Sequence, residues 1–209
     1  MDPQHAQERL RIVPANQADP ADLDALFGNR GSGHRCRCQR YRLARGESFA
    51  GMPIEERALR LVEQTRAGDP EASGTTGLIA YLDRTPVGWV AVAPRSEHQG
   101  LVRAYAVPWK GRDEDPEDAS VWAITCVFVR AGHRKRGISR ALASAAVDFA
   151  RSRGARAVEA YPIATTAVIE EELHVGTVPT FAAAGMVEVA QPTKRRRVLR
   201  TGDGDGARI

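Results

Sequence analysis

The segment from Arg134 to Arg140 combines basic side chains with a glycine, a composition typical of an anion-binding turn. It follows the strand-like run Val121–Val129 and leads into the apolar pattern of a helix. At such a junction successive backbone N–H groups converge, and the positive end of the helix dipole faces the ligand. Gly137 has no Cβ, so the backbone can approach a phosphate closely. Charge alone is equally compatible with a solvated basic loop that caps the helix.

The order of residues in this turn resembles a known motif. Arg134, Gly137 and Ser139 form the pattern Arg-x-x-Gly-x-Ser between a strand and a helix. This pattern is similar to the acetyl-CoA pyrophosphate loop of the GCN5-related N-acetyltransferase (GNAT) family. That family usually has Gly or Ala at the last position, so Ser139 is a departure, although its side chain is still small.

Three other segments support the resemblance, which covers roughly residues 10–200 and is most specific from Val121 to Tyr161. They are the hairpin strand Pro86–Val90, the Gly154-Ala155 pair before Val158–Tyr161, and the closing Phe181-x-x-x-Gly185-Met186. The resemblance implies a GNAT-type α/β fold. In this fold a mixed, mostly antiparallel central sheet with splayed core strands is flanked by helices.

The resemblance also implies acetyl-CoA as cosubstrate and direct transfer of acetyl to an amine within a ternary complex. The backbone of Val127, Phe128 and Val129 is expected to pair with the pantetheine arm like an added strand. A backbone N–H near Val127 is expected to stabilise the tetrahedral oxyanion. The residues expected to hold the pyrophosphate are Arg134, Lys135, Arg136, Gly137, Ile138, Ser139 and Arg140.

The groups that move protons depart from the family pattern. Ala123 stands where a carboxylate is usual, and Phe181 stands where many members carry the tyrosine that protonates the CoA thiolate. The asparagine often found before the last helix is absent, with His174 near its place. We therefore expect Glu159 to act as the general base and Tyr161, on the same face of its strand, to act as the acid. The alternative is that Glu159 pairs with an arginine and Tyr161 packs in the core.

Two cysteines and a histidine lie close together at His34, Cys36 and Cys38. No second Cys or His cluster follows, so the set falls short of a structural zinc pattern, and we expect no metal site. The loop is instead expected to shape the acceptor pocket, as this region does in the family. Cys126 is expected to be a small buried apolar side chain rather than a nucleophile.

Hydrophobic periodicity predicts the elements that position these residues. The expected strands are Leu10–Pro14, Thr76–Leu82, Pro86–Pro94, Val121–Val129, Ala157–Tyr161, Met186–Ala190 and Arg196–Arg200. The expected helices are Asp19–Phe27, Pro53–Ala67, Gly137–Arg153 and Thr177–Ala184. The stretches 28–46 and 96–120 are expected to be loops. We expect a single domain over residues 1–201 and a disordered tail over 202–209.

The composition is that of an ordinary globular protein, with 43% apolar and 27% charged residues in a chain of 209. Its longest apolar runs are strand-sized, and its first residues lack the apolar core of a signal peptide. We therefore expect a cytoplasmic monomer or homodimer that binds neither membrane nor nucleic acid. The net charge of +4 is compatible with an anionic ligand.

The expected function is acetyl transfer to a primary amine of a small molecule. The acceptor could be a metabolite or an aminoglycoside-like antibiotic, in which case the enzyme would confer antibiotic resistance. Two alternatives remain open at this point. One is acetylation of a protein lysine or N-terminus, and the other is a catalytically silent acyl-CoA sensor, which the missing tyrosine and carboxylate favour slightly.

Overall fold

A seven-stranded sheet organises the computed structural model, which describes residues 9–104 and 107–202. The strand order is β1-β2-β3-β4-β5-β7-β6. Neighbouring strands are antiparallel except β4 and β5, which are parallel. The strands are β1 (Leu10–Pro14), β2 (Gly77–Leu82), β3 (Thr85–Pro94), β4 (Val121–Val129), β5 (Ala157–Ala160), β6 (Val187–Thr193) and β7 (Arg196–Gly202).

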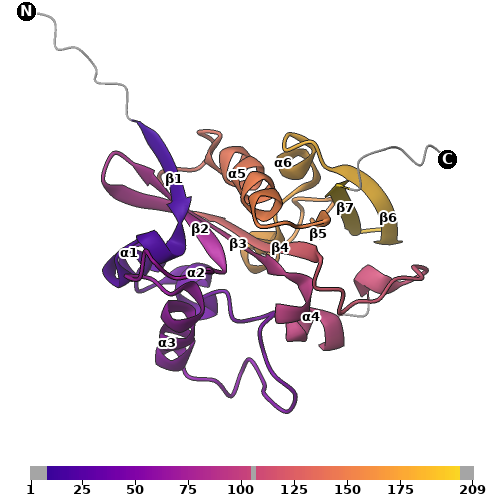
Figure 1. The fold of residues 1–209 in the computed structure, drawn as a ribbon, viewed down its shortest axis with the longest axis horizontal. Helices are drawn as coiled ribbons and strands as arrows, with labels where there is room; N and C mark the ends of the chain where they lie inside the picture. Colours follow the sequence, from indigo (N-terminus) through magenta and orange to yellow (C-terminus); the bar gives the residue numbers. More distant parts are fainter. Residues whose placement is uncertain (1–8, 105–106, 203–209) are drawn as a thin grey trace, which may run out of the picture.

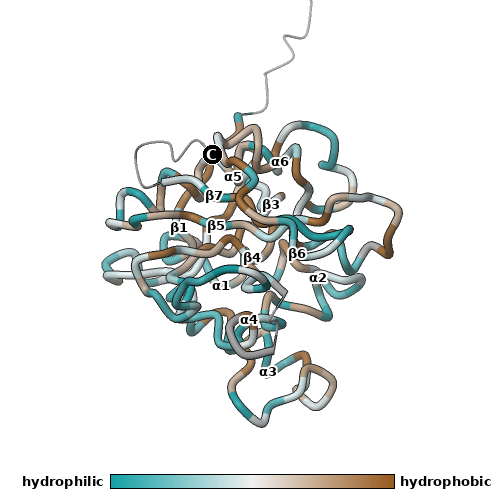
Figure 2. The backbone as a smooth tube through the Cα atoms, turned by 90° about the vertical axis from the view of Figure 1, so that its right-hand side faces the viewer, coloured by the Kyte–Doolittle hydropathy of each residue, from teal (hydrophilic) through white to brown (hydrophobic). Residues whose placement is uncertain are grey.

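Helices cover both faces of this sheet (Figures 1 and 2). The helices α5 and α6 lie on one face, whereas α1, α2 and α3 lie on the other. The α-helices are α1 (Pro20–Phe27), α2 (Gly31–Cys36), α3 (Ile54–Thr65), α4 (Gln99–Ala104), α5 (Ile138–Ser152) and α6 (Val178–Ala182). The 3₁₀ helices are η1 (Ala15–Gln17), η2 (Arg95–Glu97), η3 (Val107–Trp109) and η4 (Glu170–Val175).

Alternating side chains of the central strands form a core on each face of the sheet. Val90 of β3 packs in the cluster that contains Leu142 of α5. Its neighbour Trp89 packs on the opposite face, in the cluster that contains Leu23 and Leu26 of α1. The sheet therefore holds α5 and α1 at fixed positions on opposite faces of β3.

The two core strands β4 and β5 separate halfway along their length. Their pairing runs from Val121 and Ala157 to Ile124 and Ala160, where β5 ends. The strand β4 continues to Val129, still paired on its other side with β3 as far as Gly88. The edge of β4 from Thr125 to Val129 is therefore left without β5 as a neighbour, and this is the splay expected of the fold.

The predicted fold class is confirmed, and most predicted elements are found within a few residues of their expected bounds. Asp19 caps α1 by accepting a hydrogen bond from the Ala21 N–H at 2.8 Å. The two expected loops contain short helices, α2 in 28–46 and α4, η2 and η3 in 96–120. Their irregular composition gave no periodic signal for such short helices. The tail beyond Gly202 and the first eight residues lie outside the described residues.

No helix within residues 9–104 and 107–202 is long and apolar enough to cross a membrane.

A buried ionic cluster holds the paired half of β4 and β5 against the neighbouring segments. The Glu159 carboxylate is fully buried and pairs with Arg95 at 3.3 Å, with Arg200 at 2.8 Å and with Arg112. Glu114 joins the same three arginines from the loop after α4. The Tyr161 hydroxyl donates to Glu159 at 2.9 Å. This cluster ties β5, β7 and the segment around residue 112 together.

The pKa values in the cluster follow from burial and charge. Burial alone would raise the pKa of Glu159, but hydrogen bonds from Arg112 and Tyr161 and the charge of Arg95 bring it below its ordinary value of 4.5. Burial raises the pKa of Tyr161 well above 10. Glu159 is therefore ionised and Tyr161 is neutral at physiological pH.

Glu159→Gln should destabilise the fold strongly, because it leaves buried arginines without their central carboxylate. The expected loss is about 3–5 kcal/mol of unfolding free energy in urea titrations at pH 7. The lowered pKa means that the stabilisation by Glu159 is fully present above pH 4.5 and is lost as the pH falls through the folded-state pKa. The difference in unfolding free energy between the wild type and Glu159→Gln should therefore become smaller below pH 4.5.

A suitable control is Glu172→Gln, since Glu172 forms an exposed pair with Arg195 at 3.1 Å. Its effect should stay below about 1 kcal/mol. Equal stability of Glu159→Gln and the wild type at pH 7 would contradict the structural role of the cluster.

Candidate functional site

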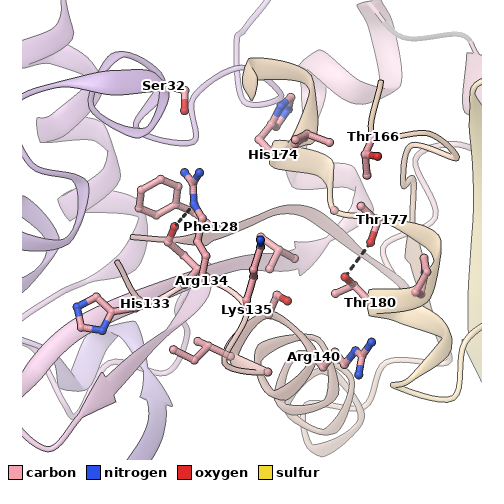
Figure 3. Close-up of a pocket in the computed structure, with 18 residues that line it drawn as sticks. Ser32, Phe128, His133, Arg134, Lys135, Arg140, Thr166, His174, Thr177 and Thr180 are labelled. Carbon is pink, nitrogen blue, oxygen red and sulfur yellow. Dashed lines mark hydrogen bonds between the residues drawn. The ribbon is translucent and has the colours of Figure 1, made fainter. Parts of the chain in front are cut away.

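A cavity of about 490 Å³ runs along the open edge of β4, and we call it the β4 groove. Figure 3 shows that Lys135 and Arg140 lie on one side of it and His174 and Thr166 on the other. It is lined by Ser32, Val127, Phe128, Val129, His133, Arg134, Lys135, Gly137, Ile138, Ser139, Arg140, Thr166, Leu173, His174, Gly176, Thr177, Pro179 and Thr180. The groove therefore brings together the end of β4, the beginning of α5 and the segment from η4 to α6.

The turn between β4 and α5 has a conformation suited to an anion. Gly137 forms the N-cap of α5 with φ +79°, and Lys135 also has a positive φ of 61°. A Cβ at Gly137 would meet no atom within 4 Å, so the space in front of this turn is open. The first N–H groups of a helix lack intrahelical partners, so this end of α5 can donate hydrogen bonds to a phosphate.

Nine of the ten residues expected to contact the cofactor line this groove. Arg136 is exposed and is not among the lining residues. Arg134 donates from Nε to the Val129 carbonyl at 3.2 Å, which links the turn to the end of β4 (Figure 3). The end of the strand, the glycine turn and most of the basic side chains thus meet at one surface.

A second cavity of about 410 Å³ lies on the other side of Phe128, and we call it the α2 cavity. It shares Ser32, Phe128 and His174 with the β4 groove. Its remaining lining residues are Phe27, Gly33, Arg35, Cys36, Cys38, Arg40, Phe49, Ala50, Met52, Pro53, Ile54, Arg57, Cys126 and Glu171. The two cavities therefore meet on the splayed half of β4.

The helix α2 lies directly against β4 because its second glycine has no side chain. A Cβ at Gly33 would come within 2.8 Å of the Phe128 ring, which itself stacks on Phe27 with ring centroids 5.5 Å apart. This close contact makes α2 one wall of the α2 cavity. Sequence reasoning placed this loop near the acceptor but found neither the helix nor its contact with Phe128.

Arginines dominate the charge around the α2 cavity. Arg57 is buried, and its two terminal nitrogens donate to the carbonyl oxygens of Arg35 and Phe49, which do not neutralise its charge. Its Nε has no hydrogen-bond partner among the described residues. The guanidinium groups of Arg40 and Arg57 lie 4.6 and 4.0 Å from the Phe49 ring centroid. Arg35 pairs with Glu171 at 2.5 Å. The lining therefore carries three arginines and a single carboxylate.

The cysteines at this site are poor nucleophiles. Burial raises the pKa of both Cys36 and Cys38, so both thiols stay protonated at neutral pH. Cys126 is buried in β4, where it packs with Trp89. Among the residues that the structure describes, no three His, Cys, Asp or Glu side chains are grouped so that they could hold a metal ion.

The structure does not bring Glu159 and Tyr161 to either cavity. Both side chains are buried in the ionic cluster at the paired end of β5, and the oxygens of Glu159 accept hydrogen bonds from arginines and from Tyr161. This geometry corrects the expectation that they act as base and acid and favours the alternative of an ion pair and a packed ring. Phe181 is fully buried in the core beside α5.

Comparisons with known proteins agree with this geometry. A model of the acetyltransferase (GNAT) family matches residues 41–168. A comparison with curated proteins finds no match.

Solved structures of low sequence identity share the fold. The structure of yncA from Salmonella typhimurium with its cofactor acetyl-CoA is 15% identical, with a TM-score of 0.53, and the alignment covers 95% of this chain and 96% of that one. A GCN5-related N-acetyltransferase from Kribbella flavida is 18% identical, with a TM-score of 0.51 and coverage of 92% and 97%. A ribosomal-protein-alanine N-acetyltransferase from Brucella melitensis is also 18% identical, with a TM-score of 0.51 and coverage of 92% and 98%.

The family model covers more than half of the chain. The protein therefore belongs to the GNAT family of acyltransferases, which use acetyl-CoA as acetyl donor.

Proposed function

We propose that the protein transfers the acetyl group of acetyl-CoA to a primary amine of a small molecule bound in the α2 cavity. The observation that carries this proposal is that the β4 groove and the α2 cavity meet at Phe128. A donor in one and an acceptor in the other would approach each other at the splayed half of β4. Such an arrangement allows direct transfer, because both reactants are held next to each other.

The β4 groove supplies the contacts that acetyl-CoA would make. The unpaired edge of β4 offers the backbone of Val127, Phe128 and Val129 to the pantetheine amides, as an added strand would require. The turn at Gly137 and the neighbouring basic residues would hold the pyrophosphate. The thioester would then lie near Val127, where a backbone N–H could stabilise the tetrahedral oxyanion.

The α2 cavity supports a small acceptor with an apolar part. Its volume lies within the range of ordinary small-molecule sites. Phe27, Phe49, Met52 and Ile54 provide apolar surface. The buried charge of Arg57, which two carbonyl oxygens bind without neutralising it, would repel a polycation such as an aminoglycoside. It favours a metabolite that is uncharged apart from its amine or that carries a carboxylate.

Gly137→Asp should abolish the rise in melting temperature that acetyl-CoA causes in the wild type. A ligand that binds only the folded state stabilises it, and the aspartate would place a side chain and a negative charge where the diphosphate binds. The measurement is a thermal shift titration with acetyl-CoA.

Gly132→Asp is the matched control, because Gly132 also has a positive φ of 87°, has open space around a Cβ and does not line the groove. It should keep the thermal shift. A normal shift in Gly137→Asp would place the cofactor elsewhere.

Ala50→Trp should raise the acceptor KM at least tenfold and leave acetyl-CoA binding unchanged. Ala50 is exposed and lines only the α2 cavity, so an indole there occupies acceptor space without disturbing the core. Ala44→Trp is the control, since Ala44 is equally exposed and lines neither cavity. Equal acceptor KM values in the two variants would argue against the α2 cavity as the acceptor site.

An amine panel tests the acceptor class. Acetyl-CoA turnover should be faster with aromatic or aliphatic amines that are neutral elsewhere or bear a carboxylate than with aminoglycosides or polyamines. Peptides with a free N-terminus or lysine should be included, because preference for them would support the protein-acetyltransferase alternative. Binding of acetyl-CoA without turnover of any amine would support the acyl-CoA sensor.

A further inference from the structure

His174 is placed where the two cavities meet. It lies in η4, and with Ser32 and Phe128 it lines both the β4 groove and the α2 cavity. Figure 3 shows its ring across the groove from Lys135. Of the three shared residues, only His174 has a side chain with a basic nitrogen.

A backbone hydrogen bond determines which ring nitrogen of His174 carries the proton. Its Nδ1 lies 2.5 Å from the carbonyl oxygen of Glu171. A carbonyl oxygen can only accept, so Nδ1 must be the N–H donor. In the neutral imidazole the lone pair is therefore on Nε2. This atom is buried and has no hydrogen-bond partner among the described residues.

The surroundings keep this imidazole neutral. Burial lowers the pKa of His174 to about 4, and the positive charges of Arg40 and Arg196 act in the same direction. The Glu171 carbonyl and the Glu172 carboxylate oppose the shift only in part. The ring stacks on Tyr41 with centroids 5.7 Å apart, which fixes its plane. At physiological pH the imidazole is therefore neutral, and its Nε2 is an acceptor that no described residue uses.

We propose that Nε2 of His174 is the proton acceptor of the acetyl transfer. This inference rests on the proposed function. The neutral amine attacks the thioester carbonyl, a C–N bond forms, and the amine nitrogen becomes positively charged in the tetrahedral intermediate. Nε2 takes the excess proton from that nitrogen. The C–S bond then breaks, and the thiolate of CoA takes a proton from the imidazolium, which restores neutral His174.

The low basicity of His174 is compatible with this role. An imidazole with a pKa of about 4 cannot deprotonate a free alkylammonium ion efficiently, so the amine must enter the cavity neutral. The proton that His174 receives comes from the more acidic nitrogen of the intermediate. The same low pKa makes the imidazolium a good acid toward the thiolate, whose reference pKa of about 8.5 is far higher. If His174 protonates the thiolate, the enzyme does not need the tyrosine that many family members have at the position of Phe181.

The test uses the most active amine of the panel as acceptor. His174→Ala should lower kcat about 10²–10⁴-fold, the usual scale for a positioned acid or base, while the thermal shift with acetyl-CoA is retained. His174→Gln should be equally slow, because a glutamine amide accepts a hydrogen bond but does not take up a proton. Added imidazole should restore turnover of His174→Ala in a saturable manner, since the variant leaves space at both cavities.

His34→Ala is the matched control. His34 also bonds a backbone carbonyl through Nδ1, that of Gly28 at 2.9 Å, but it lines neither cavity. This variant should keep wild-type kcat and gain nothing from imidazole.

The outcomes separate this assignment from the proposed function. An active wild type with near-normal kcat in His174→Ala would overturn the role of His174 alone. A near-normal kcat in His174→Gln would overturn proton transfer by His174 and would show that the side chain only positions the amine. Failure of imidazole to rescue the folded, acetyl-CoA-binding His174→Ala variant would also count against proton transfer. A wild type that acetylates no amine would overturn the proposed function and this inference together.

Discussion

The short parallel pairing between β4 and β5 is the constraint on which both cavities depend. It ends at Ile124 and Ala160, so the second half of β4 keeps β3 as a neighbour on one side and leaves its other edge open. That open edge forms the wall of the β4 groove, and Phe128 on the same stretch separates the groove from the α2 cavity. The buried cluster of Glu159 with Arg95, Arg112 and Arg200 holds the closed half in place. A stable closed half allows the open half to remain unpaired without loss of the sheet.

Buried polar groups have opposite roles at the two halves of β4, the closed half that pairs with β5 and the open half beyond it. At the closed half a carboxylate is surrounded by arginines, stays ionised and contributes to the stability of the sheet. At the open half His174 loses its charge through burial, and its buried Nε2 has no hydrogen-bond partner among the residues that the structure describes. Charge neutralisation thus makes Glu159 chemically inert, whereas desolvation of His174 leaves an acceptor available. The physical difference is that arginines pair with the Glu159 carboxylate, whereas no residue within 9–104 and 107–202 forms a hydrogen bond with His174 Nε2.

Sequence patterns predicted the sheet, the long helix α5 and the turn at Gly137 because each depends on local periodicity or on a few adjacent residues. They also predicted that the residues proposed to bind the cofactor lie together, since strand, turn and helix are contiguous in the chain. The α2 cavity could not be predicted from the sequence, because it is formed by α2, the segment near Phe49, β4 and η4, which are distant along the chain. The surroundings of Glu159 were equally hidden, because its arginine partners come from positions 95, 112 and 200. The sequence pattern around a carboxylate on a core strand does not show whether the side chain faces a substrate or three arginines.

In the mechanism that we propose, donor and acceptor meet at Phe128 and the acetyl group passes directly between them. Burial raises the pKa of Cys36 and Cys38, so these two thiols stay protonated and no acetyl group is expected on them. The most direct measurement is the initial-rate pattern with acetyl-CoA and the best acceptor amine varied together. Lines that intersect in double-reciprocal plots are predicted, because both substrates must be bound before transfer. Parallel lines, together with an acetyl group retained on the protein in the absence of amine, would contradict the account.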